Sequence, residues 1–289
     1  MLGRRGNHQT PFYDRIPLPT VGVILTVLCA GAVVMVLPFL WMVSSACKPP
    51  AEINRLPVTW APQNVSCAEN LQALYATSPH FTRYMLNTAF MTIGRTLGQL
   101  VTCSLAAYGF ARFRFPGSNL IFAVLLGLLM VPFQAIVIPE YLLIRGLGWL
   151  DLFAAIIVPG TFSAFALFLL RQSFKQIPLE LEEAAEIDGA NPLQILWRIV
   201  LPLSTPALAA FAVITVQAAW NDFLWPLVVT TSAETRVVTV GIALLQGQRN
   251  TPWNLLMIGS LLATLPMLVM FALLQRYFIE GISMSGLKG

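Results

Sequence analysis

The sequence predicts an all-α polytopic membrane protein with six transmembrane helices. Of its 289 residues, 57% are hydrophobic and only 10% are charged, whereas a soluble domain carries about 25% charged residues. Mean hydropathy is +0.73, and long uncharged stretches alternate with short charged ones. So little polar surface excludes a soluble enzyme, a disordered chain and a secreted disulfide scaffold.

Six stretches have the length and apolarity to cross about 30 Å of hydrocarbon. The second contains one charged residue, Arg95, and the fifth contains one, Asp222; the other four contain none. The first is uncharged from Ile16 to Cys47, which is longer than the apolar core of a signal peptide, and we expect it to be retained. The predicted spans are 18–46, 84–111, 118–139, 152–170, 203–230 and 254–278.

Basic residues set the predicted orientation. Ten of the 17 Lys and Arg fall on the side of the two termini and six on the other side, so both termini are expected in the cytoplasm. This gives a cytoplasmic N-terminal segment (1–17), a membrane domain (18–279) and a cytoplasmic tail (280–289). Outer loops are expected at 47–83, where frequent prolines favour turns and extended chain, and at 231–253, with the longest cytoplasmic segment at 171–202. Pro132, Pro139, Pro159 and Pro226 are expected to interrupt or end helices within the spans.

The sequence gives no support for metal binding, nucleic-acid binding or hydrolase activity. The two histidines, His8 and His80, have no ligand spacing around them, and the basic residues are scattered rather than clustered in a patch. Cys47 and Cys67 share the first outer loop, and the sequence leaves open whether their Cα atoms come close enough for a disulfide.

The cytoplasmic segment reads as two short helices around a hinge. Pro178 fits a first helical turn, and good helix formers continue to Glu186. Gly189 can end that helix with a positive φ, and Asn191 followed by Pro192 fits the start of a second helix. Five acids lie within nine residues, either as a solvated face or as a surface for a basic partner; the small Ala184 and Ala185 beside them favour protein docking. The acids are Glu180, Glu182, Glu183, Glu186 and Asp188.

This segment resembles the EAA loop of ATP-binding-cassette importer permeases. The resemblance lies in Glu183-Ala184-Ala185, in Asp188-Gly189-Ala190 and in Ile199-Val200-Leu201-Pro202 at the family's spacing. The segment from Trp220 to Leu227 is similar to one that marks the carbohydrate branch, and the tail from Gln275 to Gly289 is similar to the second permease of maltose-type importers. The resemblance runs from about residue 35 to the C-terminus.

The resemblance implies a type I ABC importer permease fold in a prokaryotic inner membrane. Residues 180–192 would form the coupling helix that docks on an ATPase subunit, with Glu183 as the salt-bridge anchor, Ala184 and Ala185 allowing close approach, and Gly189 making the turn. Glu186, Asp188 and Ala190 complete this set. The implied partners are a second permease, two ATPase subunits that hold ATP and Mg²⁺, an extracytoplasmic binding protein, lipid and a sugar. No cofactor, metal or catalytic residue is expected on this chain, which has no GxxxxGK[ST] phosphate loop.

The charged groups inside the spans have two interpretations. Each costs about 2.5–3.5 kcal/mol at mid-bilayer and should face protein or water. Asp222 either pairs with a neighbouring helix or lines a sugar path, and Arg95 is either paired or a substrate ligand. Trp225 either stacks on a sugar ring or lies in the interfacial belt. The candidates for the translocation path are Asn87, Gln134, Trp220, Asn221 and Asp222.

Three alternatives to sugar import remain. Glycerol 3-phosphate or another polyol derivative would favour extra basic groups in the path, and this chain offers only Arg95. A secondary transporter or channel would show inverted repeats or acid relays, and neither is evident. An intramembrane protease needs a second polar group beside Asp222, the one acid well inside a predicted span. Loop 231–253 either reaches into the binding protein or is an ordinary loop.

Overall fold

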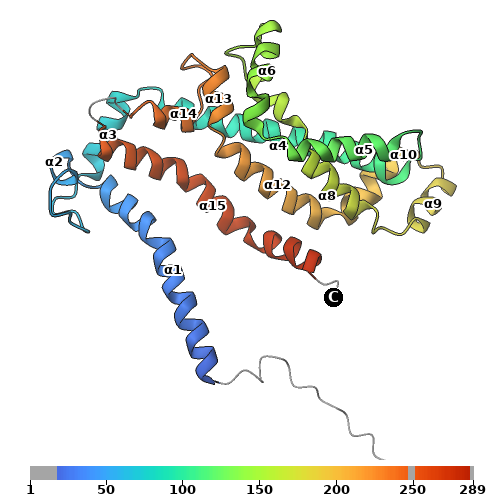
Figure 1. The fold of residues 1–289 in the computed structure, drawn as a ribbon, viewed down its shortest axis with the longest axis horizontal. Coiled ribbons are helices and arrows are strands. Elements are labelled where there is room, and N and C mark those ends of the chain that lie inside the picture. Colours follow the sequence, from blue (N-terminus) through green and yellow to red (C-terminus); the bar gives the residue numbers. More distant parts are fainter. Residues whose placement is uncertain (1–17, 247–250, 287–289) are drawn as a thin grey trace, which may run out of the picture.

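The computed structural model describes residues 18–246 and 251–286, and in this part of the chain every regular element is a helix. The helices form an elongated bundle with α2 and α3 at one end and α9 and α10 at the other (Figure 1). The long helices are α1 (Leu18–Ala46), α4 (Phe81–Arg112), α12 (Thr205–Trp220) and α15 (Trp253–Gly286). The shorter helices are α2 (Pro50–Ile53), α3 (Cys67–Thr77), α5 (Ser118–Gly127), η2 (Leu128–Met130), α6 (Phe133–Gly146), α7 (Phe153–Ile157), η3 (Pro159–Thr161), α8 (Ala164–Phe174), α9 (Glu180–Ile187), α10 (Pro192–Ile195), η4 (Leu196–Val200), α11 (Leu201–Leu203), α13 (Leu224–Val229) and α14 (Val238–Ala243).

The predicted spans correspond to helices. Those at 118–139 and 152–170 are bent within their length, and the one at 203–230 is bent at its start, at Ser204, apart from its break at 221–223. Within the described residues, α1 and α15 are each long and apolar enough to cross a membrane, and the number rises to five if each of three bent helix pairs forms one span. The bends are 106° between η2 and α6, 40° between η3 and α8, and 81° between α11 and α12. α4 is 32 residues long and is not among these candidates, because Asn87, Arg95 and Gln99 lower its hydropathy.

Proline predicts two of the helix breaks and misplaces a third. The helices are interrupted at Pro132 and shortly after Pro159. Proline has no backbone N–H, so it cannot donate a helical hydrogen bond. In the fifth span the break lies at 221–223, whereas Pro226 lies inside α13. Asp222, turned toward Arg95, occupies this break. Pro139 likewise lies inside α6 without ending it.

α4 is the central helix, and it packs along α8 and α12. Three clusters of buried side chains surround it. Near α9 and α10, a cluster joins α4, α5, α8 and α12 around Phe174 and Phe211. In the middle, Met91 of α4 packs with Ile156 and Trp225. At the opposite end, Phe81 packs with α3, α14 and α15.

The end of the bundle that contains α2 and α3 is fixed by a disulfide and by buried polar contacts. Cys47 and Cys67 form the disulfide, with their Cα atoms 4.1 Å apart, which answers the pairing that the sequence leaves open. The amide of Asn70 donates to the carbonyls of Ala46 and Lys48, at 2.9 and 2.8 Å. The loop 47–83, predicted as turns and extended chain, therefore contains two helices and an ordered core.

α1 and the chain ends differ from the rest. α1 contacts α15 near the disulfide and diverges from it further along (Figure 1), and its most apolar 18-residue window is entirely unburied. α15 continues to Gly286, beyond the predicted span end at 278. The predicted N-terminal segment 1–17, residues 247–250 of the second outer loop and the last three residues of the tail motif lie outside the described residues.

Candidate functional site

Residues 180–195, which we call the elbow, fold as the sequence predicts. α9 ends before Gly189, whose φ of +84° reverses the chain in a conformation that disfavours residues with a Cβ. The side chain of Asn191 accepts from the N–H of Gln194, and the Gln194 side chain accepts from the N–H of Asn191. This reciprocal capping box starts α10, so local signals alone account for the two helices and the turn between them.

The outward face of the elbow is acidic with an apolar tip. Ile187 at the end of α9 is 86% exposed, and its acidic neighbours are also exposed: Glu180, Glu183, Glu186 and Asp188. The two alanines of the motif point in different directions. Ala184 is exposed, whereas Ala185, together with Ala190, packs against the core cluster near α8. The protruding acidic face has the form of a docking surface.

Glu182 attaches the elbow to the bundle, a role that the sequence analysis does not assign to it. Its carboxylate forms a buried ion pair with Arg112 at the end of α4, with Oε1 2.6 Å from Nη2 and 2.7 Å from Nε. The Tyr108 hydroxyl donates to Oε2 at 3.3 Å. Arg112 Nη2 also donates to the carbonyls of Phe174 and Ile177, at 2.8 and 3.1 Å. One guanidinium therefore joins α4, the end of α8 and α9.

Helical spacing contains a signal for Glu182. It lies three residues before Ala185, so both fall on the face of α9 that packs inward. Glu183, the predicted anchor, points away from the bundle. Nothing in the sequence identifies Arg112 as the partner, because the pair is 70 residues apart.

A polar cavity of about 430 Å³ lies beside the middle of α4. Residues from the three helix breaks border it: Phe133 after the first, Phe162 and Ser163 at the second, and Asp222 at the third. Irregular backbone at membrane depth is tolerated where it is enclosed by protein or lines a cavity. The three breaks therefore converge on one site.

Three charged side chains line this cavity. Arg95 Nη1 and Asp222 Oδ2 are 2.5 Å apart, so the paired interpretation of both residues is confirmed. Glu140 of α6 lines the same cavity and interacts electrostatically with both. The predicted third span stops one residue before it. Gln99 bridges the wall, donating to the Gly160 carbonyl at 2.7 Å and accepting from Thr215 at 3.1 Å.

The other candidates for the translocation path lie elsewhere. Asn87 is buried and donates at 2.8 Å to the carbonyls of Glu234 and Arg236. Trp220 donates to the Ala263 carbonyl at 3.0 Å. Gln134 and Asn221 are exposed, and neither is among the residues that line the cavity. Trp225 does line it and is 3% exposed, with its indole N–H donating to Ala155 at 2.9 Å.

Asp151 holds the second loop, at the end of the bundle opposite the elbow. Its carboxylate accepts from the N–H groups of Thr231 and Ser232, at 2.7 and 2.9 Å, and from the hydroxyls of Thr231 and Thr235. Burial opposes its charge, but hydrogen bonds led by that from the Ser232 N–H outweigh burial and hold the pKa of Asp151 well below its usual range. The loop is thus fixed by an ionised carboxylate and neutral donors.

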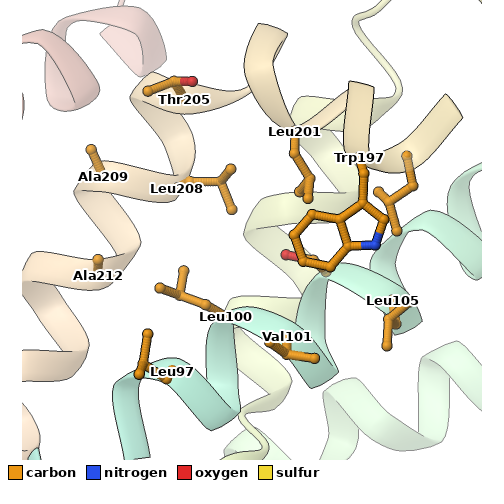
Figure 2. Close-up of a pocket in the computed structure, with 12 residues that line it drawn as sticks. Leu97, Leu100, Val101, Leu105, Trp197, Leu201, Thr205, Leu208, Ala209 and Ala212 are labelled. Atoms are coloured by element: carbon orange, nitrogen blue, oxygen red, sulfur yellow. The ribbon is translucent and has the colours of Figure 1, made fainter. Parts of the chain in front are cut away.

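An apolar groove of about 450 Å³ lies between α4 and α12. Figure 2 shows leucines from both helices and the indole of Trp197 around one open space. Among the lining residues only Ser104 and Thr205 carry side-chain polar atoms other than the Trp197 N–H. The groove has the chemistry to contact lipid or another apolar helix.

An all-helical bundle with broken spans around a polar cavity, and an acidic elbow at one end, defines a membrane transport permease. Residues 99–283 match the family described as binding-protein-dependent transport system inner membrane component. The chain belongs to this family of ABC importer permeases, and the predicted all-α membrane permease fold is confirmed. The number of six spans stays a prediction, because the described residues contain two candidate spans, or up to five.

The chain aligns with individual relatives over nearly its whole length. The chain is 35% identical to the lactose transport system permease protein LacG of Rhizobium radiobacter, over 89% of this chain and 92% of that protein. It is 34% identical to the sn-glycerol-3-phosphate transport system permease protein UgpE of Escherichia coli K12, over 89% and 94%. A crystal structure of a bacterial ABC transporter involved in the import of the acidic polysaccharide alginate matches with a TM-score of 0.81 at 25% identity, over 93% of this chain and all of that one.

Proposed function

We propose that this chain is one of two permease subunits of an importer for a sugar or oligosaccharide, and that the elbow receives the movement of the ATPase subunits. The observation that carries the proposal is the two-sided build of α9. Its inner face is fixed to α4 through Glu182 and Arg112, while Glu183, Glu186 and Ile187 stand free on the outer face. A force applied outside would therefore pass into the central helix.

The elbow suits a protein partner of particular chemistry. The exposed Ile187 would enter an apolar recess, and the surrounding acids would face basic side chains. The elbow then lies in the cytoplasm, as the distribution of basic residues predicts, and the disulfide end faces outward, where disulfides persist. ATP and Mg²⁺ bind to the ATPase subunits, and this chain performs no chemistry itself.

Two apolar surfaces are suited to contact with a second permease subunit. α1 has nothing covering its most apolar window within the described residues, and the groove between α4 and α12 offers a complementary apolar surface (Figure 2). Relatives named for lactose and arabinooligosaccharide transport support a carbohydrate cargo. The outer loop around Asp151 and Thr231 would face the extracytoplasmic binding protein.

Charge reversal on the elbow tests the coupling. Glu183→Lys in the assembled complex should abolish import and cargo-stimulated ATP hydrolysis, because a cation replaces the acid that faces a basic partner. Glu69→Lys on α3 makes the same charge change at the opposite end, on another exposed residue, and should leave both activities intact.

Copurification separates the proposal from a secondary transporter or channel. An ATPase with a Walker A sequence should accompany the wild-type chain. A chain that transports in vesicles without any such ATPase, or a Glu183→Lys complex with normal coupled hydrolysis and import, would contradict the proposal.

A further inference from the structure

The cavity beside α4 holds one more negative than positive charge. Arg95 contributes the positive charge, and Asp222 and Glu140 contribute negative ones. The three residues come from different elements: the middle of α4, the break after α12, and α6. Within the part of the chain that the structure describes, no other Lys, Arg, Asp or Glu lines this cavity.

The charge of Arg95 is already balanced by Asp222. Its Nη1 is held by Asp222 at 2.5 Å, and its guanidinium lies against the backbone of Gly160, where an added Cβ would be only 2.1 Å from Nε. Turning it toward a bound anion would break the ion pair and leave the Asp222 carboxylate partly buried without its partner, which is costly.

Among the described residues that line this cavity, Glu140 is the charged side chain without a hydrogen-bond or ion-pair partner. The Gln99 amide is used on both sides, by Gly160 and Thr215, and the Ser163 hydroxyl accepts from the Ala166 N–H at 3.3 Å. Across residues 18–246 and 251–286, no hydrogen bond or ion pair engages the Glu140 carboxylate. A carboxylate is an acceptor only, so it suits a ligand that donates hydrogen bonds.

We infer that this cavity is a cargo site that rejects anions and takes a hydroxyl-rich, uncharged compound, with Glu140 as the acceptor for its hydroxyls. The inference rests on the proposed function and narrows its cargo. It separates this chain from an importer of sn-glycerol 3-phosphate or of an acidic polysaccharide, the cargos in the names of two of its relatives. The volume of about 430 Å³ is within the range of small-molecule sites.

Charged thiol reagents measure this selectivity without knowledge of the cargo. Ala218 lines the cavity and is exposed, so Ala218→Cys would place a thiol in it, in a background with Cys29 and Cys103 replaced by alanine. The assembled complex is treated with a cationic and an anionic methanethiosulfonate, and each rate is divided by the reagent's rate with a free thiol in solution.

The cationic reagent should react about tenfold faster than the anionic one after this normalisation, and Glu140→Gln should bring the ratio close to one. Glu234→Gln, which removes an exposed acid at 62% side-chain exposure, is the matched control and should leave the ratio unchanged. If the Glu140→Gln complex fails to assemble, the ratio of normalised rates measured at Ala218→Cys with Glu140 intact still tests the inference.

Three results would overturn the inference: no reaction with either reagent, equal normalised rates with Glu140 present, or import of sn-glycerol 3-phosphate by the wild-type complex. ATPase copurification is measured on the same samples. A complex that retains its ATPase but shows no charge preference refutes the cargo site alone, whereas loss of the ATPase from the wild-type sample refutes the proposed function.

Discussion

Among the described residues, two of the ion pairs that join α4 to distant parts of the chain are largely buried, and they differ in how completely their atoms find partners. In the pair at the elbow, the side chains of Arg112 and Glu182 are 9% and 6% exposed, and Tyr108 and two carbonyls complete the network. In the pair at the cavity, Arg95 and Asp222 are each 19% exposed, and Arg95 Nε is buried without an acceptor.

The difference in exposure and in hydrogen-bond partners indicates what each pair does. A buried pair in which no buried side-chain polar atom lacks a partner fixes one geometry, which suits a joint that transmits force. A pair beside a polar cavity, with a third charge from Glu140 nearby, should contribute less to stability and more to the electric potential inside the cavity.

The largest expected effect comes from breaking the elbow pair. Arg112→Met leaves Glu182 buried without a cation and should lower the free energy of unfolding by about 3–5 kcal/mol, as measured by thermal unfolding in detergent. Arg114→Met, two residues away and exposed, is the control and should change little. Adding Glu182→Leu to Arg112→Met should restore much of the loss; equal behaviour of the Arg112 and Arg114 variants would contradict a structural joint.

Breaking the cavity pair should cost less. Asp222→Asn is expected to lower the free energy of unfolding by about 2 kcal/mol, because Glu140 remains close to Arg95 and the site is partly wet. Asp188→Asn on the exposed elbow is the control, and the same thermal unfolding assay applies. A loss as large as that of Arg112→Met would show that the two pairs do not differ as described.

Asp151 sharpens the comparison because neutral donors, rather than a cation, hold its carboxylate. Asp151→Asn should cost about 1–2 kcal/mol at neutral pH. Because the pKa of Asp151 is lower in the folded than in the unfolded chain, its stabilisation is fully present above the unfolded value of about 4 and is lost progressively as pH falls from there towards the folded value. Unfolding measured from pH 7 to pH 3 should show the difference between the variant and the wild type narrowing at the acid end; a constant difference would contradict the assignment.

The smallest effect is expected for the exposed pair of Arg83 and Glu234, which are 4.0 Å apart with side chains 50% and 62% exposed. Arg83→Gln should change the free energy of unfolding by less than about 0.5 kcal/mol, measured in the same assay with and without added salt. A decrease in the free energy of unfolding above about 1 kcal/mol would mean that side-chain exposure does not determine the order of these effects.

Local signals explain what the sequence predicts well. Gly189 and the Asn191–Pro192 pair act within a few residues of themselves, so the elbow could be predicted with its turn. Hydropathy predicts the apolar stretches, which fold as helices in the described residues, and Pro132 and Pro159 predict two of the helix breaks. The pairings of Arg112 with Glu182 and of Arg95 with Asp222 could not be predicted, because they join residues 70 and 127 positions apart. Glu140 was missed because it follows the last residue of the predicted third span.

Gly160 and Arg95 restrict each other's replacement, because the guanidinium occupies the space that a side chain at position 160 would need. An alanine at position 160 would place its methyl carbon 2.1 Å from Arg95 Nε, so the guanidinium would have to move or be removed. Substitutions at the two positions are therefore expected to be coupled, and libraries that alter the charge of this cavity should vary the two codons together.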